Sequence, residues 1–197
     1  MRRTLWMGAL LGMAASAASA GTFVVRPGGE SKVTFLSKAT IESFTGKTGR
    51  LEGRVVVDTA AVGDSITAHL EVDLASLDTG NAHRNRNMRD QHLETDKFPK
   101  AIFDGAAVLG PTGARLAAGQ PVTIQIEGTF TLHGVSRRLR VEVEATYSEK
   151  EGSGRIAFHT VFPVNLADYA VTRPEFLFLK LAESQEVRVS ALAVAAP

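Results

Sequence analysis

Apolar residues recur at every second position along most of this chain, and this period of two constrains the fold more than any other feature. The longest examples are residues 65–74, 122–133 and 138–147, where apolar and polar residues alternate. Side chains of a β-strand point alternately to the two faces of a sheet, so the pattern predicts half-buried strands. Shorter examples lie at residues 32–37, 50–58, 101–109, 155–164 and 185–194. The alternation therefore predicts about eight strands.

Short connections join the predicted strands. Residues 133–136 separate two matched alternating runs and predict a β-hairpin, and Gly-rich turns separate other runs. Antiparallel strands with one apolar face form either a two-sheet sandwich or a closed barrel. Hairpin-sized connections favour the barrel. We therefore predict an all-β fold, an eight-stranded antiparallel up-and-down barrel, formed by one domain at residues 21–197.

One segment departs from the alternation. Residues 81–95 are mostly polar and place Met88, His92 and Leu93 at helical spacing, which predicts one short surface helix beside the barrel. We expect this helix to end before Pro99, because the residue preceding a proline avoids helical dihedral angles.

The inward phase of the strands defines a candidate site for an apolar ligand tail. An eight-stranded barrel is either filled by side chains or holds one small ligand. Small inward residues at Gly53, Ala68, Gly128 and Ala145 favour a cavity, although small residues also relieve strand curvature. The candidate tail-binding residues are Phe35, Ala68, Leu70, Val72, Phe103, Ile124, Ile126, Gly128, Phe130, Leu139, Val141, Val143, Phe158 and Phe162.

Residues 1–20 have the pattern of a secretory signal peptide. Arg2 and Arg3 precede an apolar stretch of about a dozen residues, and Ala18-Ser19-Ala20 form a small-residue cleavage site. A membrane-spanning helix needs about 20 apolar residues, so we expect cleavage before Gly21 and no stable membrane insertion. The mature chain is then a periplasmic or secreted protein.

The charge balance argues against a nucleic-acid partner. Without Arg2 and Arg3, 20 of the 22 basic side chains remain against 21 acidic ones. A near-neutral chain has no overall field to attract a polyanion.

The sequence carries no recognisable catalytic machinery. It has no cysteine, and so no disulfide, thiolate metal site or cysteine nucleophile. It also has no phosphate-binding glycine loop and no nucleophile elbow. His69, His133 and His159 lie in the polar phase of strands, where we expect them to face solvent. His83 and His92 could meet a metal near Asp90, but a surface role is the simpler interpretation. We expect no catalytic residue, no metal and no resident cofactor.

Three arginines lie close together in the predicted helix. Arg84, Arg86 and Arg89 could hold a phosphate or carboxylate head group while the tail enters the barrel. A solvated helix face is the alternative interpretation.

Three separate stretches resemble one known family. Residues 77–103 include Leu77-Asp78-Thr79-Gly80 and the run from Leu93 to Pro99; the others are the hairpin at 128–135 and residues 166–174. Together they resemble the YceI-like, polyisoprenoid-binding family, over about residues 22–194. The resemblance implies a lipocalin-like barrel with a helix beside it, whose apolar interior holds the tail of an isoprenoid or similar amphiphile.

Two functional hypotheses follow. The first is a non-enzymatic protein that carries or sequesters a long apolar amphiphile, such as a polyisoprenoid, a quinone or a fatty-acid-like lipid. The alternative is an envelope stress or interaction protein whose barrel is only a scaffold for protein partners. A homodimer is compatible with either hypothesis.

Overall fold

The computed structural model describes residues 20–38, 43–62, 66–109, 114–173, 175–176, 179–180 and 182–197. Residues 1–19 of the predicted signal peptide lie outside this set, so the cleavage site stays a prediction. The strands are β1 (Gly21–Val25), β2 (Lys32–Ser37), β3 (Phe44–Thr48), β4 (Leu51–Val57), β5 (Ile66–Asp73), β6 (Lys100–Leu109), β7 (Pro121–Leu132), β8 (Val135–Lys150), β9 (Ser153–Asn165), β10 (Glu175–Phe176), β11 (Leu179–Lys180) and β12 (Ser184–Ala195). The helical elements are η1 (Leu74–Ser76), α1 (Ala82–Asn87), η2 (Met88–His92) and η3 (Leu166–Tyr169).

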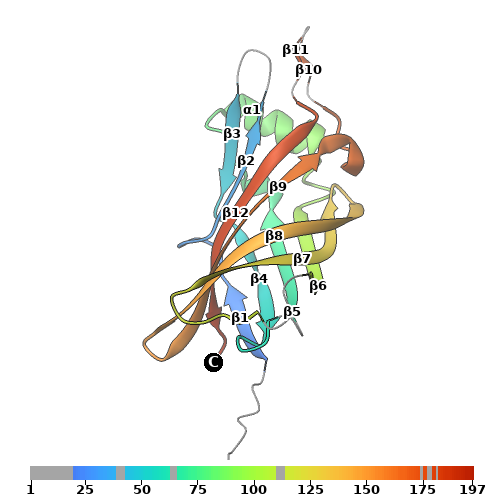
Figure 1. The fold of residues 1–197 in the computed structure, drawn as a ribbon. Coiled ribbons are helices and arrows are strands. Elements are labelled where there is room, and N and C mark those ends of the chain that lie inside the picture. The colour runs from blue at the N-terminus through green and yellow to red at the C-terminus, as the bar shows by residue number, and fades with distance from the viewer. Residues whose placement is uncertain are drawn as a thin grey trace, which may run out of the picture.

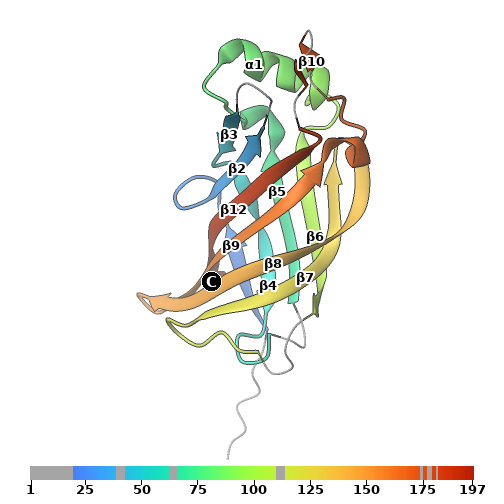
Figure 2. The same ribbon diagram turned by 45° about the horizontal axis from the view of Figure 1, so that its top comes forward.

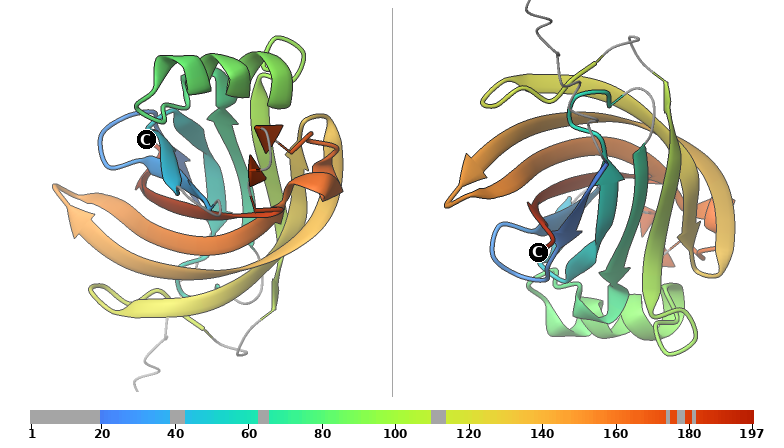
Figure 3. Two further views of the ribbon diagram at one scale, coloured as in Figure 1. Left: turned by 90° about the horizontal axis from the view of Figure 1, so that it is seen from above. Right: turned by 90° about the horizontal axis from the view of Figure 1, so that it is seen from below.

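Eight strands close into a barrel. Hydrogen-bonded neighbours follow the order β1-β4-β5-β6-β7-β8-β9-β12, and β12 returns to β1 with Phe23 opposite Ala195. Every pair is antiparallel, and from β4 to β9 each strand lies beside its sequence neighbour, so the predicted up-and-down barrel is confirmed. Figure 3 shows from both ends how the strands curve around a common axis.

The β2–β3 hairpin lengthens the wall at one end of the barrel. The C-terminal part of β12 pairs with β1, and residues 186–190 of β12 pair with β2. β1 and β2 therefore lie end to end along the same edge of β12. β3 continues the wall beside β2 in the same way that β4 lies beside β1. Figure 1 shows this hairpin at the upper end, on the same side as α1.

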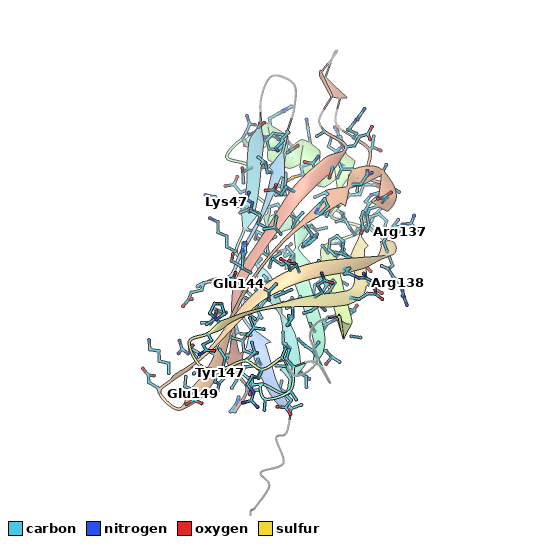
Figure 4. The ribbon with its side chains drawn as sticks, viewed as in Figure 1. Lys47, Arg137, Arg138, Glu144, Tyr147 and Glu149 are labelled. Atoms are coloured by element: carbon cyan, nitrogen blue, oxygen red, sulfur yellow. The ribbon has the colours of Figure 1, made fainter. Side chains whose placement is uncertain are left out.

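Burial follows the predicted alternation along the long strands. In β7 the side chains of Ile124, Ile126, Phe130 and Leu132 are buried, and the intervening residues are exposed or half-buried. β8 repeats the pattern, and its polar phase, which includes Arg138 and Glu144, is exposed on the outer face (Figure 4). One face of each strand therefore forms the barrel interior.

Two of the small inward residues serve strand geometry. A Cβ at Gly128 would lie 2.4 Å from the Asp104 carbonyl oxygen and 2.7 Å from the Gly105 Cα atom, at a bulge where the β6–β7 register shifts. A Cβ at Gly53 would lie 2.0 Å from the carbonyl oxygen of His69. For these two glycines the close approach of neighbouring backbones accounts for the small residue.

The predicted helix is present at residues 82–92 and is continuous. Asn81 begins it, because its side chain accepts a hydrogen bond from the Arg84 amide. Leu93 ends it, and its backbone N–H donates a hydrogen bond to the Met88 carbonyl oxygen. α1 forms the first part, and η2 is a π-helical second part. Figure 2 places it over the end of the barrel that also carries the β2–β3 hairpin and β10. Among the described residues, no helix has the length and apolar character needed to cross a bilayer.

Candidate ligand-binding cavity

The barrel interior is hollow. A cavity of about 890 Å³ lies inside it, and its wall is mainly aliphatic and aromatic. This volume falls within the range of about 300–1,000 Å³ typical of small-molecule sites. The predicted tail-binding residues that line it are Phe35, Ala68, Leu70, Val72, Phe103, Ile124, Ile126, Phe130, Val141, Val143, Phe158 and Phe162.

Gly128 and Leu139 were also proposed to contact the tail, and the structure places both outside the cavity lining. Gly128 is opposite Leu139 in the β7–β8 register, and it packs against the backbone of β6. Leu139 has the inward phase of β8 but is only partly buried against the core. The close approach of β6 and β7 at Gly128 accounts for the absence of this glycine from the wall.

At one end of the barrel, the described residues that line the cavity are apolar. Val62 is completely buried and Leu116 is 6% exposed, and both line the cavity. Their loops are joined by two backbone hydrogen bonds, from Val62 to Ala114 at 2.9 Å and from Leu116 to Thr59 at 2.8 Å. This end of the cavity suits a hydrocarbon tail, because its described side chains are apolar.

The opposite end is polar because the helix turns one face toward the cavity. The helix residues in the lining are His83, Arg84, Asn87, Met88, Gln91 and His92. The predicted surface helix is therefore also part of the cavity wall. Met88 and Leu93 lie on its cavity side, together with the polar residues. The cavity thus runs from an apolar end to a polar end.

Among the three arginines proposed to hold a head group, only Arg84 lines the cavity. Its Nε and Nη2 atoms donate to the hydroxyl and carbonyl oxygens of Thr79 at 3.0 and 3.1 Å. Its guanidinium carbon lies 4.1 Å from the centre of the Phe44 ring, a cation–π distance that joins the helix to β3. Arg86 is exposed, and Arg89 makes a 3.4 Å bond to the Ala75 carbonyl. The three guanidinium groups therefore do not converge on one anion.

His92 lies half-buried at the polar end. Its Nδ1 atom lies 3.0 Å from the Thr172 carbonyl oxygen, which can only accept, so this nitrogen carries the proton. Burial lowers the pKa of His92, and the bond to Thr172 opposes this effect more weakly. Burial thus favours the neutral ring, and the bond to Thr172 leaves Nε2 as its acceptor nitrogen.

His133 differs from its predicted position on the solvent face of a strand. It lies in the β7–β8 turn with a φ of 51°, and its side chain is only 11% exposed. Its Nε2 atom lies 3.0 Å from Glu94 Oε2, and its ring packs against Phe98 with the centroids 4.6 Å apart. Because Glu94 follows the helix directly, this contact anchors the C-terminal end of the helix to the barrel.

The outer histidines have polar neighbours. His69 contacts Asp104 at 2.6 Å and Glu71 at 3.1 Å, and the bond to Asp104 is the main cause of its raised pKa. His159 contacts the Ser190 hydroxyl at 2.9 Å. Within the described ranges, no group of three or more His, Asp or Glu residues is arranged to hold a metal ion.

Comparison with known proteins identifies the family. The family model for the YceI-like domain matches residues 23–195. The chain belongs to the YceI-like family. Its relatives include a UPF0312 protein of Shewanella putrefaciens, 27% identical over 173 residues that cover 84% of this chain and 86% of the relative. A UPF0312 protein of Vibrio campbellii is 25% identical over 143 residues, or 71% of this chain and 69% of the relative.

Solved structures share the YceI-like fold. A polyisoprenoid binding domain from Saccharophagus degradans has a TM-score of 0.69 at 22% identity and covers 90% of this chain and all of its own. BcnA of Burkholderia cenocepacia has a TM-score of 0.64 at 20% identity, covering 82% of this chain and 95% of its own. The YCEI protein of Campylobacter jejuni has a TM-score of 0.66 at 17% identity, covering 80% and 88%. The resemblance inferred from the sequence is thus confirmed.

Sequence reasoning missed several residues of the YceI-like cavity wall. Those on strands, such as Val55, Leu132 and Val164, share the inward phase of runs that the alternation had already identified. Those on the helix, including Asn87 and Gln91, are polar, and no apolar periodicity distinguishes them from solvent-facing residues. Only the spacing of Met88 and Leu93 marked the inward face of the helix.

Proposed function

We propose that this YceI-like protein binds one long apolar amphiphile inside its barrel and carries or sequesters it without catalysing a reaction. The observation that carries the proposal is the apolar cavity of about 890 Å³ inside the barrel, with polar side chains gathered at the helix end. A structural neighbour of this chain is a polyisoprenoid binding domain. A polyisoprenoid, a quinone or a fatty-acid-like lipid has the matching form, a long tail with one polar head.

Burial of the tail supplies the binding free energy. Each methylene group removed from water contributes about 0.8 kcal/mol, so a dozen contribute about 10 kcal/mol. The loss of translational freedom and the ordering of the chain reduce this sum. A wall of branched and aromatic side chains needs no charged group to obtain tight binding of this kind.

An empty barrel is also unfavourable for the protein itself. Side chains that border a void lose their dispersion contacts, and stability falls as the void grows. A ligand that fills the space restores these contacts, so we expect bound lipid to raise the unfolding temperature.

The proposal includes export. Residues 1–20 would direct the chain out of the cytoplasm, and the mature protein would act in the periplasm or outside the cell. There it would meet membrane lipids that have escaped into water.

Organic extraction tests the proposal. The protein would be purified from its exported fraction without detergent, extracted with solvent, and analysed by mass spectrometry. We expect about one lipid-like molecule per chain, and reloading of the extracted protein should restore its unfolding temperature. Protein that carries no lipid and binds none on reloading would contradict the carrier function and favour the scaffold hypothesis.

A further inference from the structure

Two buried polar atoms in the cavity wall have no hydrogen-bond partner in the part of the chain that the structure describes. They are Ser37 Oγ and Gln185 Oε1. Ser37 is 1% exposed and Gln185 is 6% exposed, and both residues line the cavity. Buried polar groups are almost always paired, because an unpaired group loses its bonds to water without replacement. A partner supplied by the ligand would remove this penalty.

The two residues are neighbours across one strand pair. β2 and β12 pair with Leu36 opposite Glu186, and the same register places Ser37 opposite Gln185 on one face. Ser37 is also opposite Phe44 in the β2–β3 pair, and the Phe44 ring contacts the Arg84 guanidinium. The pair therefore lies near the helix, at the polar end of the cavity.

The hydrogen bond that Gln185 already makes shows which kind of ligand group would pair with Gln185 and Ser37. Gln185 Nε2 donates to the Ala182 carbonyl oxygen at 2.7 Å. A carbonyl oxygen only accepts, so the amide orientation is fixed and Gln185 presents its oxygen as an acceptor. The Ser37 hydroxyl can donate and accept. A complementary group must therefore donate to Gln185 and can accept from Ser37.

We propose that Ser37 and Gln185 form a head-group subsite for an uncharged group that both donates and accepts hydrogen bonds, namely a hydroxyl or a primary amide. This inference rests on the proposed function and narrows its ligand class. A long-chain alcohol or primary amide would satisfy both side chains. A carboxylate, a phosphate ester or a quinone carbonyl only accepts and would leave Gln185 Oε1 unpaired. An ether would do the same.

A matched pair of ligands tests the subsite. Delipidated protein would be equilibrated with cyclodextrin-loaded 1-hexadecanol or 1-methoxyhexadecane, and bound ligand would be quantified by mass spectrometry. The two molecules have the same tail, but only the alcohol donates a hydrogen bond. We expect the wild type to prefer the alcohol about tenfold. In Ser37→Ala/Gln185→Leu this preference should disappear, while affinity for the ether stays within about twofold.

Thr160→Val provides the control variant. Thr160 also lines the cavity, but its hydroxyl already donates to the Glu142 carbonyl at 2.6 Å. This variant should lose stability and keep the preference for the alcohol. In the delipidated state, the single variant Ser37→Ala should unfold at the wild-type temperature or above, because the Ser37 hydroxyl makes no hydrogen bond there that the variant could lose.

The outcomes separate the subsite from the carrier function. Equal wild-type affinity for alcohol and ether would overturn the subsite and leave the carrier function standing. A preference that survives in the double variant would also overturn it. Failure of the wild type to bind either ligand would overturn the carrier function and the subsite together.

Discussion

Ala68 provides a direct test of the hollow interior. It lies on β5 between Val55 and Gly105 of the neighbouring strands, and its side chain lines the cavity. In Ala68→Leu the added methyl groups would enter ligand space. We expect the free energy of unfolding of the delipidated protein to change by less than about 1 kcal/mol, whereas overpacking of a filled core costs about 1–3 kcal/mol. Binding of a fluorescent fatty probe should fall.

Thr67→Leu is the matched control, because Thr67 is exposed and belongs to the outward phase of the same strand. It should leave probe binding unchanged. A large loss of stability in delipidated Ala68→Leu, with no probe binding by the wild type, would mean that the interior is packed.

Enlarging Gly128 should lower stability, in contrast to the enlargement of Ala68. A Cβ at this position would lie 2.4 Å from the Asp104 carbonyl oxygen, so Gly128→Ala forces β6 and β7 apart. We expect a loss of about 2–3 kcal/mol of stability, with or without lipid. Chemical denaturation measures it, and a variant as stable as the wild type would show that the strands can separate at no cost.

The contrast between these two residues marks how far the sequence could predict the site. Alternation identifies which side chains point inward, and Ala68, Ile124 and Phe162 line the cavity as that phase requires. It does not show how closely two backbones approach, and so it could not distinguish Gly128 from a residue of the wall. Ser37 ends the short strand β2, and which residue of β12 lies opposite it depends on the strand register, which the alternation does not show.

Among the elements, the long strands were the most predictable. The alternation at residues 122–133 and 138–147 corresponds to β7 and β8, whose lengths leave room for many repeats of the pattern. β1 and β3 were not predicted. β1 carries three successive apolar residues, and β3 has one apolar residue among five. An alternation of apolar and polar residues cannot be recognised in strands of only five residues. The positions of these two strands depend instead on pairing with strands that are distant in the sequence.

The helix end should be sensitive to acid. Contacts with Lys97 and, more weakly, His133 lower the pKa of Glu94, so its ionised form is favoured in the folded protein. The stability that the ionised Glu94 adds to the folded protein is fully present above the pKa that this carboxyl group has in the unfolded chain. It disappears as the pH falls through the lowered pKa of the folded state. We therefore expect Glu94→Gln to lower the unfolding temperature at neutral pH, with the difference vanishing once the pH has fallen below the lowered pKa of Glu94.

Asp96→Asn removes a neighbouring exposed carboxylate and serves as the control. It should not reproduce this dependence on pH. If Glu94→Gln and the wild type unfold together at neutral pH, the contacts of Glu94 with Lys97 and His133 do not stabilise the helix end.

For the whole molecule, the first prediction concerns maturation. We expect the exported protein to begin at Gly21, because Ala18 and Ala20 supply the small residues that a signal peptidase requires. Intact-mass measurement of the exported protein tests this. Ala20→Lys should block cleavage, whereas Ser19→Gln, at the unconstrained middle position, should not. A wild-type mass that retains residues 1–20 would contradict the prediction.

The pairing of β1 with β12 also sets the order of events during synthesis. Phe23 and Ala195 stand near the two ends of the sequence that forms the barrel, yet they are opposite each other in the wall. Contacts between such distant residues form late, because a long loop must first be closed. A chain that has not been fully synthesised has no closed cavity and exposes an open sheet with one apolar face. If the barrel carries a lipid as proposed, loading must therefore follow the pairing of β12 with β1.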